Sequence, residues 1–186
     1  MKLLIGLGNI GKEYDNTRHN IGFAALDFVY ENWLRGEGFS EWSENKKFQA
    51  LVSTGTLNGE KVILAKPTTF MNNSGIATQL LAAYYKIEPQ NIIVLHDDVD
   101  LPFGTVKIQA NRGSAGHNGI KSIIEKLGTQ DFTRVRIGVA KADKRKQGDT
   151  GDFVLNRFNI LEKLQLKKIK AAALVEVRKL LSGGKI

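Results

Sequence analysis

The sequence predicts an α/β fold, in which helices flank a mixed, twisted β-sheet within a single domain. Two short apolar runs, residues 3–5 and 92–95, have the length of buried parallel strands. Two longer strand-like segments, residues 48–57 and 61–66, flank the dipeptide Asn58-Gly59, which strongly favours a tight hairpin turn. Helical patterns occur between these strands, and 186 residues suit one domain spanning residues 1–186.

Composition narrows the class of protein. The chain is 42% hydrophobic and 25% charged, which is ordinary for a soluble globular protein. It has no cysteine, which excludes disulfides, thiolate metal sites and a cysteine nucleophile. No apolar run has the length of a membrane span, and Met1-Lys2 leads into a strand rather than into a signal peptide. We therefore expect a cytoplasmic protein with no membrane partner.

The net charge of +8 is unevenly distributed along the chain. Residues 1–100 carry 9 Lys and Arg against 12 Asp and Glu, a net charge of −3, whereas residues 101–186 carry 18 against 7, a net charge of +11. Such an asymmetry favours a polyanionic partner, with nucleic acid the leading candidate. A basic face that is merely solvated is the alternative.

Residues 2–20 form the segment around which the predicted site is organised. Its apolar strand is followed by glycines at positions 6, 8 and 11 and then by a polar stretch without helical periodicity. The segment therefore delivers Asn9, Tyr14 and His19 on a loop at the carboxyl end of a buried strand. Loops held by a rigid scaffold are where binding and catalytic residues concentrate.

The same glycines have the Gly-x-Gly-x-x-Gly spacing of dinucleotide-binding folds. In those folds the third glycine opens a helix, and an acidic residue about 20 positions further on holds the ribose. Here the next helical pattern starts only at Asn20, and Asp27, which has roughly the right spacing, lies inside that helix. We therefore expect no nicotinamide and no other cofactor.

A helix and a second loop follow in the chain. Asn20 is the predicted N-cap of a helix reaching about residue 34. Pro67 ends a strand, residues 68–75 form a polar loop, and a helix spans about residues 74–85. Phe70 and Met71 in this loop are individually typical of core side chains, but a place between a strand end and a helix start favours a binding crevice.

The strand at 92–95 runs into His96 and then into three carboxylates within residues 97–100. A metal site would need more oxygen ligands or histidines at a fixed spacing, whereas His19, His96 and His117 are isolated from one another. We therefore expect no metal. A carboxylate paired with a loop histidine fits better, because it would hold the imidazole tautomer and stabilise its protonated form.

Residues 111–119 form a glycine-rich loop between a strand at 106–109 and a helix at 120–127. An arginine in such a loop, free backbone N–H groups and the helix dipole together favour phosphate, although the loop lacks the Gly-Lys-Ser/Thr of nucleotide-triphosphate sites. The strand at 133–139 carries Arg134 and Arg136 on one face, which predicts an edge of a phosphate-binding surface. Simple solvation of the two arginines is the alternative.

The remaining chain is basic. Residues 141–151 have the composition of a flexible loop, and a helix runs from Asn159 to about residue 181. Its charged residues are expected to face solvent or phosphate. Its apolar residues are expected to pack on the core, and they are Leu161, Leu164, Ile169, Val177 and Leu180.

Five motifs, in order and covering nearly the whole chain, resemble bacterial peptidyl-tRNA hydrolase. They are Gly6-Leu-Gly-Asn with Thr17-Arg-His-Asn-Ile-Gly22, Thr69-Phe-Met-Asn-Asn-Ser-Gly75, His96-Asp-Asp-Val-Asp-Leu-Pro102, Gly113-Ser-Ala-Gly-His-Asn-Gly119 and Arg134-Val-Arg-Ile-Gly138. The resemblance implies a single α/β domain around a mixed sheet. It also implies hydrolysis of the ester between a peptide and the terminal ribose of tRNA, with peptidyl-tRNA as the partner of a monomeric enzyme.

The resemblance also implies roles for individual residues. His19 matches the catalytic base of the family, Asp97 the carboxylate that keeps it basic, and Asn9 the asparagine that separates N-blocked from free aminoacyl-tRNA. Contacts to tRNA or to the peptidyl-adenosine are implied for Tyr14, Phe70, Asn72 and Asn118, and the crevice position of Met71 adds it to this set.

The chain departs from the family pattern at two positions. Ile10 stands where proline is common, which puts the aim of Asn9 in doubt. Gln109 stands where some members have lysine, which leaves Lys107 and Arg136 as the expected pair for a terminal phosphate.

The chemistry can also be argued from the residues alone. An ester is easier to cleave than an amide, so one general base activating water suffices, with the amide of Asn9, Asn72 or Asn118 donating to the oxyanion. Direct attack by water is favoured because residues 113–116 lack the Gly-x-Ser-x-Gly spacing of a serine nucleophile. A non-catalytic RNA-binding relative, such as the plant organellar splicing cofactors, is the alternative, and Asn9, His19 and Asp97 together disfavour it.

Overall fold

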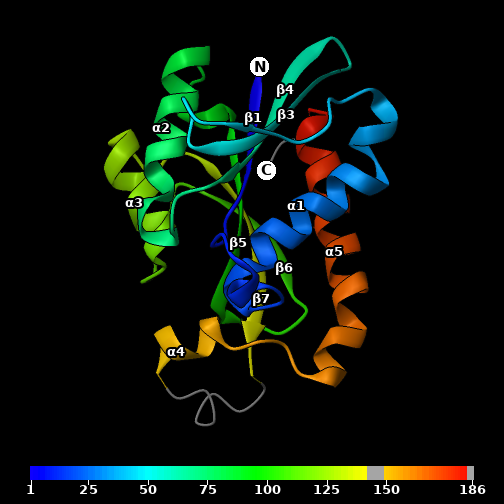
Figure 1. Cartoon of the computed structure of the whole chain (residues 1–186), viewed down its shortest axis with the longest axis vertical. Helices are drawn as coiled ribbons and strands as arrows, with labels where there is room; N and C mark the ends of the chain where they lie inside the picture. The colour runs from blue at the N-terminus through cyan, green and yellow to red at the C-terminus, as the bar shows by residue number, and fades with distance from the viewer. Residues whose placement is uncertain (142–148, 184–186) are drawn as a thin grey trace.

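The computed structural model describes residues 1–141 and 149–183, whose centre is one seven-stranded mixed sheet (Figure 1). Its strand order is β2-β3-β4-β1-β5-β7-β6. The four central strands β4, β1, β5 and β7 are parallel, and β2, β3 and β6 are antiparallel to their neighbours. The strands span Lys2–Gly6 (β1), Ser43–Asn45 (β2), Ala50–Leu57 (β3), Glu60–Pro67 (β4), Ile92–Pro102 (β5), Val106–Ala110 (β6) and Thr133–Ala140 (β7). The predicted mixed α/β sheet is confirmed.

The hairpin between β3 and β4 forms where the sequence predicted it. Leu57 pairs with Glu60, and the two turn residues between them, Asn58 and Gly59, both have positive φ (51° and 78°). Positive φ at both central positions is the conformation that favours Asn-Gly in a two-residue turn. The short edge strand β2 was not predicted, because three polar residues carry no strand signal.

Helices cover both faces of the sheet (Figure 1). Helices α1 (Ile21–Asn32) and α5 (Ile160–Leu181) lie on one face, and α2 (Ser74–Tyr85) and α3 (Asn118–Leu127) lie on the other. Side chains alternate along β1, so Leu4 packs toward α1 and α5 while Leu3 and Ile5 pack toward α2 and α3. The central strands are therefore buried on both sides, as their continuous apolar runs indicated.

Short helical segments complete the described chain. Helix α4 (Thr150–Leu155) was not predicted; it follows part of the expected basic loop, of which residues 142–148 lie outside the described residues. No described helix is long and apolar enough to cross a membrane. The 3-10 segments are Lys12–Tyr14, Arg18–Asn20, Leu34–Glu37, Met71–Asn73 and Pro89–Asn91.

Helix α5 begins at a capping box, in which Asn159 accepts from the backbone of Glu162 and the Glu162 side chain accepts from the backbone of Asn159. Its predicted core packing is wrong for the first turns, since Leu161 and Leu164 are 71% and 75% exposed. Those turns lie beyond the end of the sheet that buries Ile169 and the later apolar residues (Figure 1). Periodicity predicted the apolar stripe but not how far the sheet would cover it.

The loops that carry the candidate site meet at the carboxyl edge of the parallel strands. Strand β1 pairs with β5 only as far as Gly6 and Leu95, whereas β5 continues to Pro102 with β7 as its one strand partner. The prediction that the carboxylates follow the strand is therefore wrong, since residues 96–100 lie within β5. The uncovered edge of β5 beyond Leu95 is where the loop after β1 lies.

Glycine lets the start of α1 approach these strands closely. A Cβ on Gly22 would lie 2.4 Å from the backbone oxygen of Leu95 and 2.6 Å from that of Leu7, which no side chain tolerates. The backbone N–H of Phe23 donates to Leu7 O at 3.0 Å, so the contact is also hydrogen-bonded. This approach brings the residues just before α1 against β5.

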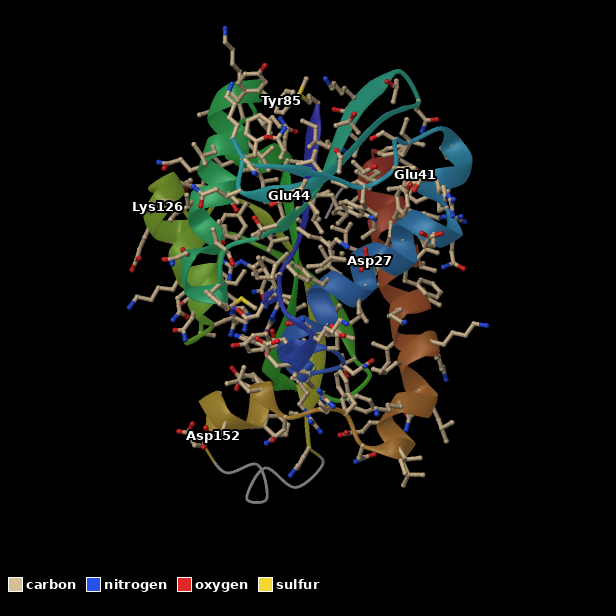
Figure 2. All side chains as sticks on the ribbon, viewed as in Figure 1. Asp27, Glu41, Glu44, Tyr85, Lys126 and Asp152 are labelled. Carbon is tan, nitrogen blue, oxygen red and sulfur yellow. The ribbon has the colours of Figure 1, made fainter. Side chains whose placement is uncertain are left out.

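Side chains fill the space between the helices and the sheet. Charged side chains such as Glu41, Lys126 and Asp152 extend from the surface into solvent (Figure 2). The buried charged groups stand out against this pattern, and most of them lie in the candidate site.

Candidate active site

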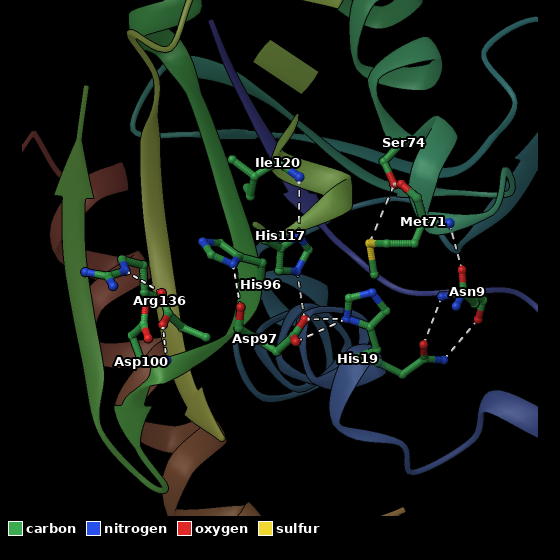
Figure 3. Close-up of polar contacts among 12 residues, drawn as sticks. Asn9, His19, Met71, Ser74, His96, Asp97, Asp100, His117, Ile120 and Arg136 are labelled. Atoms are coloured by element: carbon green, nitrogen blue, oxygen red, sulfur yellow. Dashed lines mark hydrogen bonds and ion pairs between the residues drawn. The ribbon is translucent and has the colours of Figure 1, made fainter. Parts of the chain in front are cut away.

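A histidine and an aspartate from distant parts of the chain meet at the carboxyl edge of the sheet (Figure 3). His19 lies in the short segment before α1, and its Nδ1 is 2.9 Å from Oδ1 and 3.1 Å from Oδ2 of Asp97 on β5. His19 is 8% exposed and Asp97 is 1% exposed. The predicted pairing of a loop histidine with a carboxylate is therefore present in the structure.

The protonation states in this pair follow from Asp97. Burial alone would raise the pKa of Asp97, but the electrostatic interactions and hydrogen bonds with His117 and His19 outweigh burial and hold that pKa below its usual range. An ionised carboxylate can only accept hydrogen bonds, so Nδ1 of His19 must carry a proton. The other ring nitrogen, Nε2, points toward the side where Asn9 and Met71 lie (Figure 3).

The three histidines of the chain form one cluster, which corrects the expectation that they are isolated. The rings of His19 and His117 are 5.0 Å apart, and those of His96 and His117 are 4.8 Å apart. His117 Nε2 lies 2.9 Å from Oδ1 of Asp97, so this histidine is a member of the site that sequence reasoning missed. Its place before a helix start, as an N-cap residue, was the available signal.

This cluster also bears on metal binding. One ligand atom each of His19, Asp97 and His117 lies within 4.8 Å of the others, a spacing that a metal ion could bridge. Direct hydrogen bonds join the three groups instead. The expectation of no metal rested on the isolation of the histidines in the sequence, and it stays a prediction.

Asn9 is held rigidly beside His19. Its Oδ1 accepts the Met71 backbone N–H at 2.7 Å, and its own backbone exchanges two hydrogen bonds with the Asn20 amide, at 2.9 and 3.0 Å. Asn20 is the N-cap residue of α1, as predicted, but its side chain makes no hydrogen bond to the helix and holds Asn9 instead. Since Oδ1 is occupied by a donor, the group that Asn9 can offer a ligand is its NH₂, which donates.

A cavity of about 430 Å³ opens beside His19, Asp97 and His117. Its walls come from the end of β5, the glycine-rich loop, the start of α3 and helix α4, and they include His19, Asp97, Asp100, Asn118 and Thr150. A second hollow of about 550 Å³ has Asn9 and Asn20 in its wall. The structure thus brings Asn118 together with the histidine–aspartate pair in one cavity and places Asn9 in the wall of the other.

The other predicted contacts lie around this centre. Met71 is buried and Phe70 is 55% exposed, so the core interpretation holds for Met71 and fails for Phe70. The ring of Phe70 meets the ring of Tyr14 edge-on, with centroids 6.3 Å apart, although the two residues lie on different loops. Asn72 is exposed on the segment Met71–Asn73.

Arg18, next to His19, ties the loop to the region between α4 and α5. Its guanidinium donates to both carboxylate oxygens of Glu162 at 2.7 Å and to the carbonyl oxygens of Asn156 and Arg157. It also stacks over the ring of Phe153, 4.5 Å from the centroid. These buried hydrogen bonds and the stacking on Phe153 immobilise the backbone that carries His19.

The two arginines of β7 do not lie on an exposed edge, which corrects both readings of the sequence. Strand β7 is interior, and Arg134 and Arg136 are 2% and 6% exposed. Arg136 donates to Asp98 through Nε and to Gln109 through Nη1, each at 2.7 Å. Of the pair expected to meet a phosphate, only Lys107, directly opposite Arg136 on the edge strand β6, is exposed.

The fold and the site together define an α/β protein with a histidine–carboxylate pair suited to general acid–base chemistry at the carboxyl edge of its sheet. Comparison with known proteins identifies the family. The family model described as peptidyl-tRNA hydrolase matches residues 3–185, so the chain belongs to the peptidyl-tRNA hydrolase family, as its motifs predicted.

Individual relatives agree with this assignment. The chain is 40% identical to the peptidyl-tRNA hydrolase of Brevibacillus brevis over 173 residues, which cover 93% of this chain and 87% of the relative. It is 46% identical to that of Mycoplasma capricolum over 159 residues, or 86% and 81% of the two chains. The crystal structure of the Acinetobacter baumannii peptidyl-tRNA hydrolase superposes with a TM-score of 0.86 at 30% identity, covering 98% of this chain and 89% of the other.

Proposed function

We propose that this protein hydrolyses the ester bond between a peptide, or an N-blocked amino acid, and the 3′-terminal ribose of tRNA, and so returns free tRNA to translation. Membership of the peptidyl-tRNA hydrolase family supports the reaction. The single structural observation that carries the proposal is the contact between His19 Nδ1 and the buried carboxylate of Asp97. That contact leaves a basic ring nitrogen, Nε2, available beside the cavity.

In the proposed mechanism, His19 acts as a general base on water. Nε2 takes a proton from the water as its oxygen attacks the ester carbonyl, and Asp97 stabilises the imidazolium that results. The side-chain amide of Asn72 or Asn118 donates to the oxyanion. When the carbon–oxygen ester bond breaks, the imidazolium returns its proton to the ribose oxygen, so the products are a free carboxylic acid and a free hydroxyl.

Asn9 is proposed to select N-blocked substrates. Its Oδ1 is taken by the Met71 N–H, so its NH₂ would donate to the carbonyl of the blocking acyl group. A free aminoacyl-tRNA has no such carbonyl and could not form this bond. The rigid support of the Asn9 backbone by Asn20 would fix the aim of the donor.

The tRNA itself is proposed to bind through contacts around this centre. The ring pair of Tyr14 and Phe70 offers an apolar surface for the terminal adenosine or the peptide, and the buried Met71 lies next to Phe70 in the chain. Lys107 is the exposed cation proposed to contact a phosphate. Arg136 already donates from Nε and Nη1, so it would contact the same phosphate only through Nη2.

The protein is further proposed to act as a cytoplasmic monomer of one domain, without cofactor or metal. The absence of cysteine supports the compartment. Sedimentation of the purified chain tests the monomer, and turnover after dialysis against a chelator tests the metal. Lost activity that Zn²⁺ restores would overturn the metal-free proposal.

A turnover assay on N-acetyl-aminoacyl-tRNA tests the proposed activity. We expect His19→Ala to lose roughly a hundredfold or more in kcat, because that is what a positioned general base contributes. Binding of tRNA and the melting temperature should change little. Glu13→Ala, an exposed position on the same loop, is the matched control. Absence of turnover in the wild type rejects the activity, and near-normal turnover in His19→Ala rejects the general-base role alone.

A further inference from the structure

His117 has two hydrogen bonds that fix its tautomer. It is the N-cap of α3, and its Nδ1 accepts the backbone N–H of Ile120 at 3.3 Å. A nitrogen that accepts an N–H cannot carry a proton itself, so the neutral ring must hold its proton on Nε2. The first turn of α3 therefore selects the tautomer of this histidine.

The protonated nitrogen points at the catalytic pair. His117 Nε2 lies 2.9 Å from Oδ1 of Asp97, and the same oxygen is 2.9 Å from Nδ1 of His19 (Figure 3). The side chains of His117 and Asp97 are 9% and 1% exposed, so water competes little for this bond. Asp97 thus receives one donor from the loop after β1 and a second from the start of α3, two elements that reach it from different sides.

Other ionisable groups near the pair are accounted for. His96 packs its ring against His117 from β5, and burial lowers its pKa to about 3, so it is neutral. Asp98 is held by Arg136 at 2.7 Å, and Asp100 lines the cavity. The negative charge that both His19 and His117 contact is therefore that of the Asp97 carboxylate.

We propose that His117 is a positioning residue of the hydrolysis, which acts through Asp97 by donating to the oxygen that also accepts from His19. This inference rests on the proposed function and extends it to a residue that never touches the substrate. The bond orients the carboxylate toward His19 and takes up part of its charge. Because Nδ1 of His117 accepts the Ile120 N–H, the ring directs its Nε2 proton at Asp97, and the proton from water goes to His19.

The pH dependence of kcat/KM separates this role from simple helix capping. His117→Asn keeps an oxygen that can cap α3 but is too short to reach Asp97. With one donor removed, more of the carboxylate charge acts on His19 and favours its protonated form. We expect the acidic limb of the profile to move to higher pH by about half to one pH unit. A limb at the wild-type position would overturn the proposal.

Two further measurements keep the test decisive. His117→Ala removes both bonds, so it should move the limb in the same direction and also lower the melting temperature, whereas His117→Asn should melt close to the wild type. If neither variant folds, long-range ¹H–¹⁵N NMR of the wild-type histidines reports the tautomer directly. A proton on Nε2 of His117 supports the proposal, and a proton on Nδ1 overturns it.

The same experiments distinguish the two levels of inference. A wild-type protein without turnover would reject the proposed function, while the NMR result would still decide the tautomer of His117. A wild-type protein with turnover whose acidic limb ignores His117→Asn would reject only the positioning role.

Discussion

Acid should destabilise this protein through His96, and its surroundings determine by how much. The ring is 3% exposed, Nδ1 donates to the backbone oxygen of Asp97 at 2.6 Å, and Nε2 is buried with no partner among the described residues. Burial lowers the pKa of His96 to about 3, against the opposing effects of Asp97 and Asp98. The folded protein therefore keeps His96 neutral where the unfolded chain protonates it.

The direction and size of the effect follow from proton linkage. The ordinary histidine pKa is about 6.5, so between about pH 6.5 and pH 3 the unfolded chain binds a proton that the folded protein does not. Stability contributed by neutral His96 is therefore lost as the pH falls through this window. Between pH 7 and pH 5 the loss is about 2 kcal/mol, and it is insensitive to the folded pKa as long as that pKa lies well below 5.

Urea unfolding at pH 7 and pH 5 measures this loss. His96→Asn keeps a donor for the Asp97 oxygen, and His96→Phe keeps the ring volume. Each substitution also changes the free energy of unfolding by an amount that does not depend on pH. Comparing each protein with itself at the two pH values cancels that amount. We expect both variants to lose about 2 kcal/mol less than the wild type between pH 7 and pH 5. Equal losses in all three proteins would refute the reasoning, because His96 would then titrate normally in the folded state.

Three further predictions concern the proposed activity. Asp97→Asn should move the acidic limb of kcat/KM to lower pH, because a neutral amide does not stabilise protonated His19; an unmoved limb would show that the pair is not coupled. Asn9→Ala should narrow the preference for N-acetylated over free aminoacyl-tRNA by about fivefold, the value of one hydrogen bond of about 1 kcal/mol, whereas equal losses on both substrates would make Asn9 an oxyanion donor. Lys107→Ala should raise KM for full-length tRNA more than for a short peptidyl-nucleotide and reduce the log–log salt slope by roughly 0.7 to 0.9, and an unchanged slope would place the phosphate contact elsewhere. Arg136 is unsuitable for that test, because removing it would leave Asp98 buried without its partner.

Local signals in the sequence predicted several elements closely. The turn at Asn58-Gly59, the bounds of α2 and the start of α5 at Asn159 all depend on contacts between residues a few positions apart. Backbone conformation at positive φ, helical periodicity and capping are properties of short segments, so the sequence contains them directly. The parallel strands were also found, because burial on both faces requires a continuous apolar run.

The candidate site was predicted mainly through its motifs. The pairing of His19 with a carboxylate was inferred from residue chemistry, and the choice of Asp97 came from the resemblance to the family. Neither source indicated that His117 would reach the same oxygen, because residues 19, 97 and 117 converge only when β1, β5 and α3 are assembled. For the same reason the sequence predicted Asn20 at the N-cap of α1, where it lies, but did not indicate that its amide holds Asn9 across the loop.

Relations between neighbouring elements were decided by the tertiary structure alone. Strand β5 extends beyond the end of β1 because β7 continues to pair with it as far as Pro102, and no pattern within β5 encodes that partner. Arg134 and Arg136 are buried with partners from other elements: Arg134 donates to the Gly113 carbonyl oxygen, and Arg136 pairs with Asp98 and donates to Gln109. The sequence by itself determined most of the helices, strands and turns, and which residues can carry chemistry. Which of them share a charge, a hydrogen bond or a boundary with water depends on distances across the fold, and only the packed structure sets those distances.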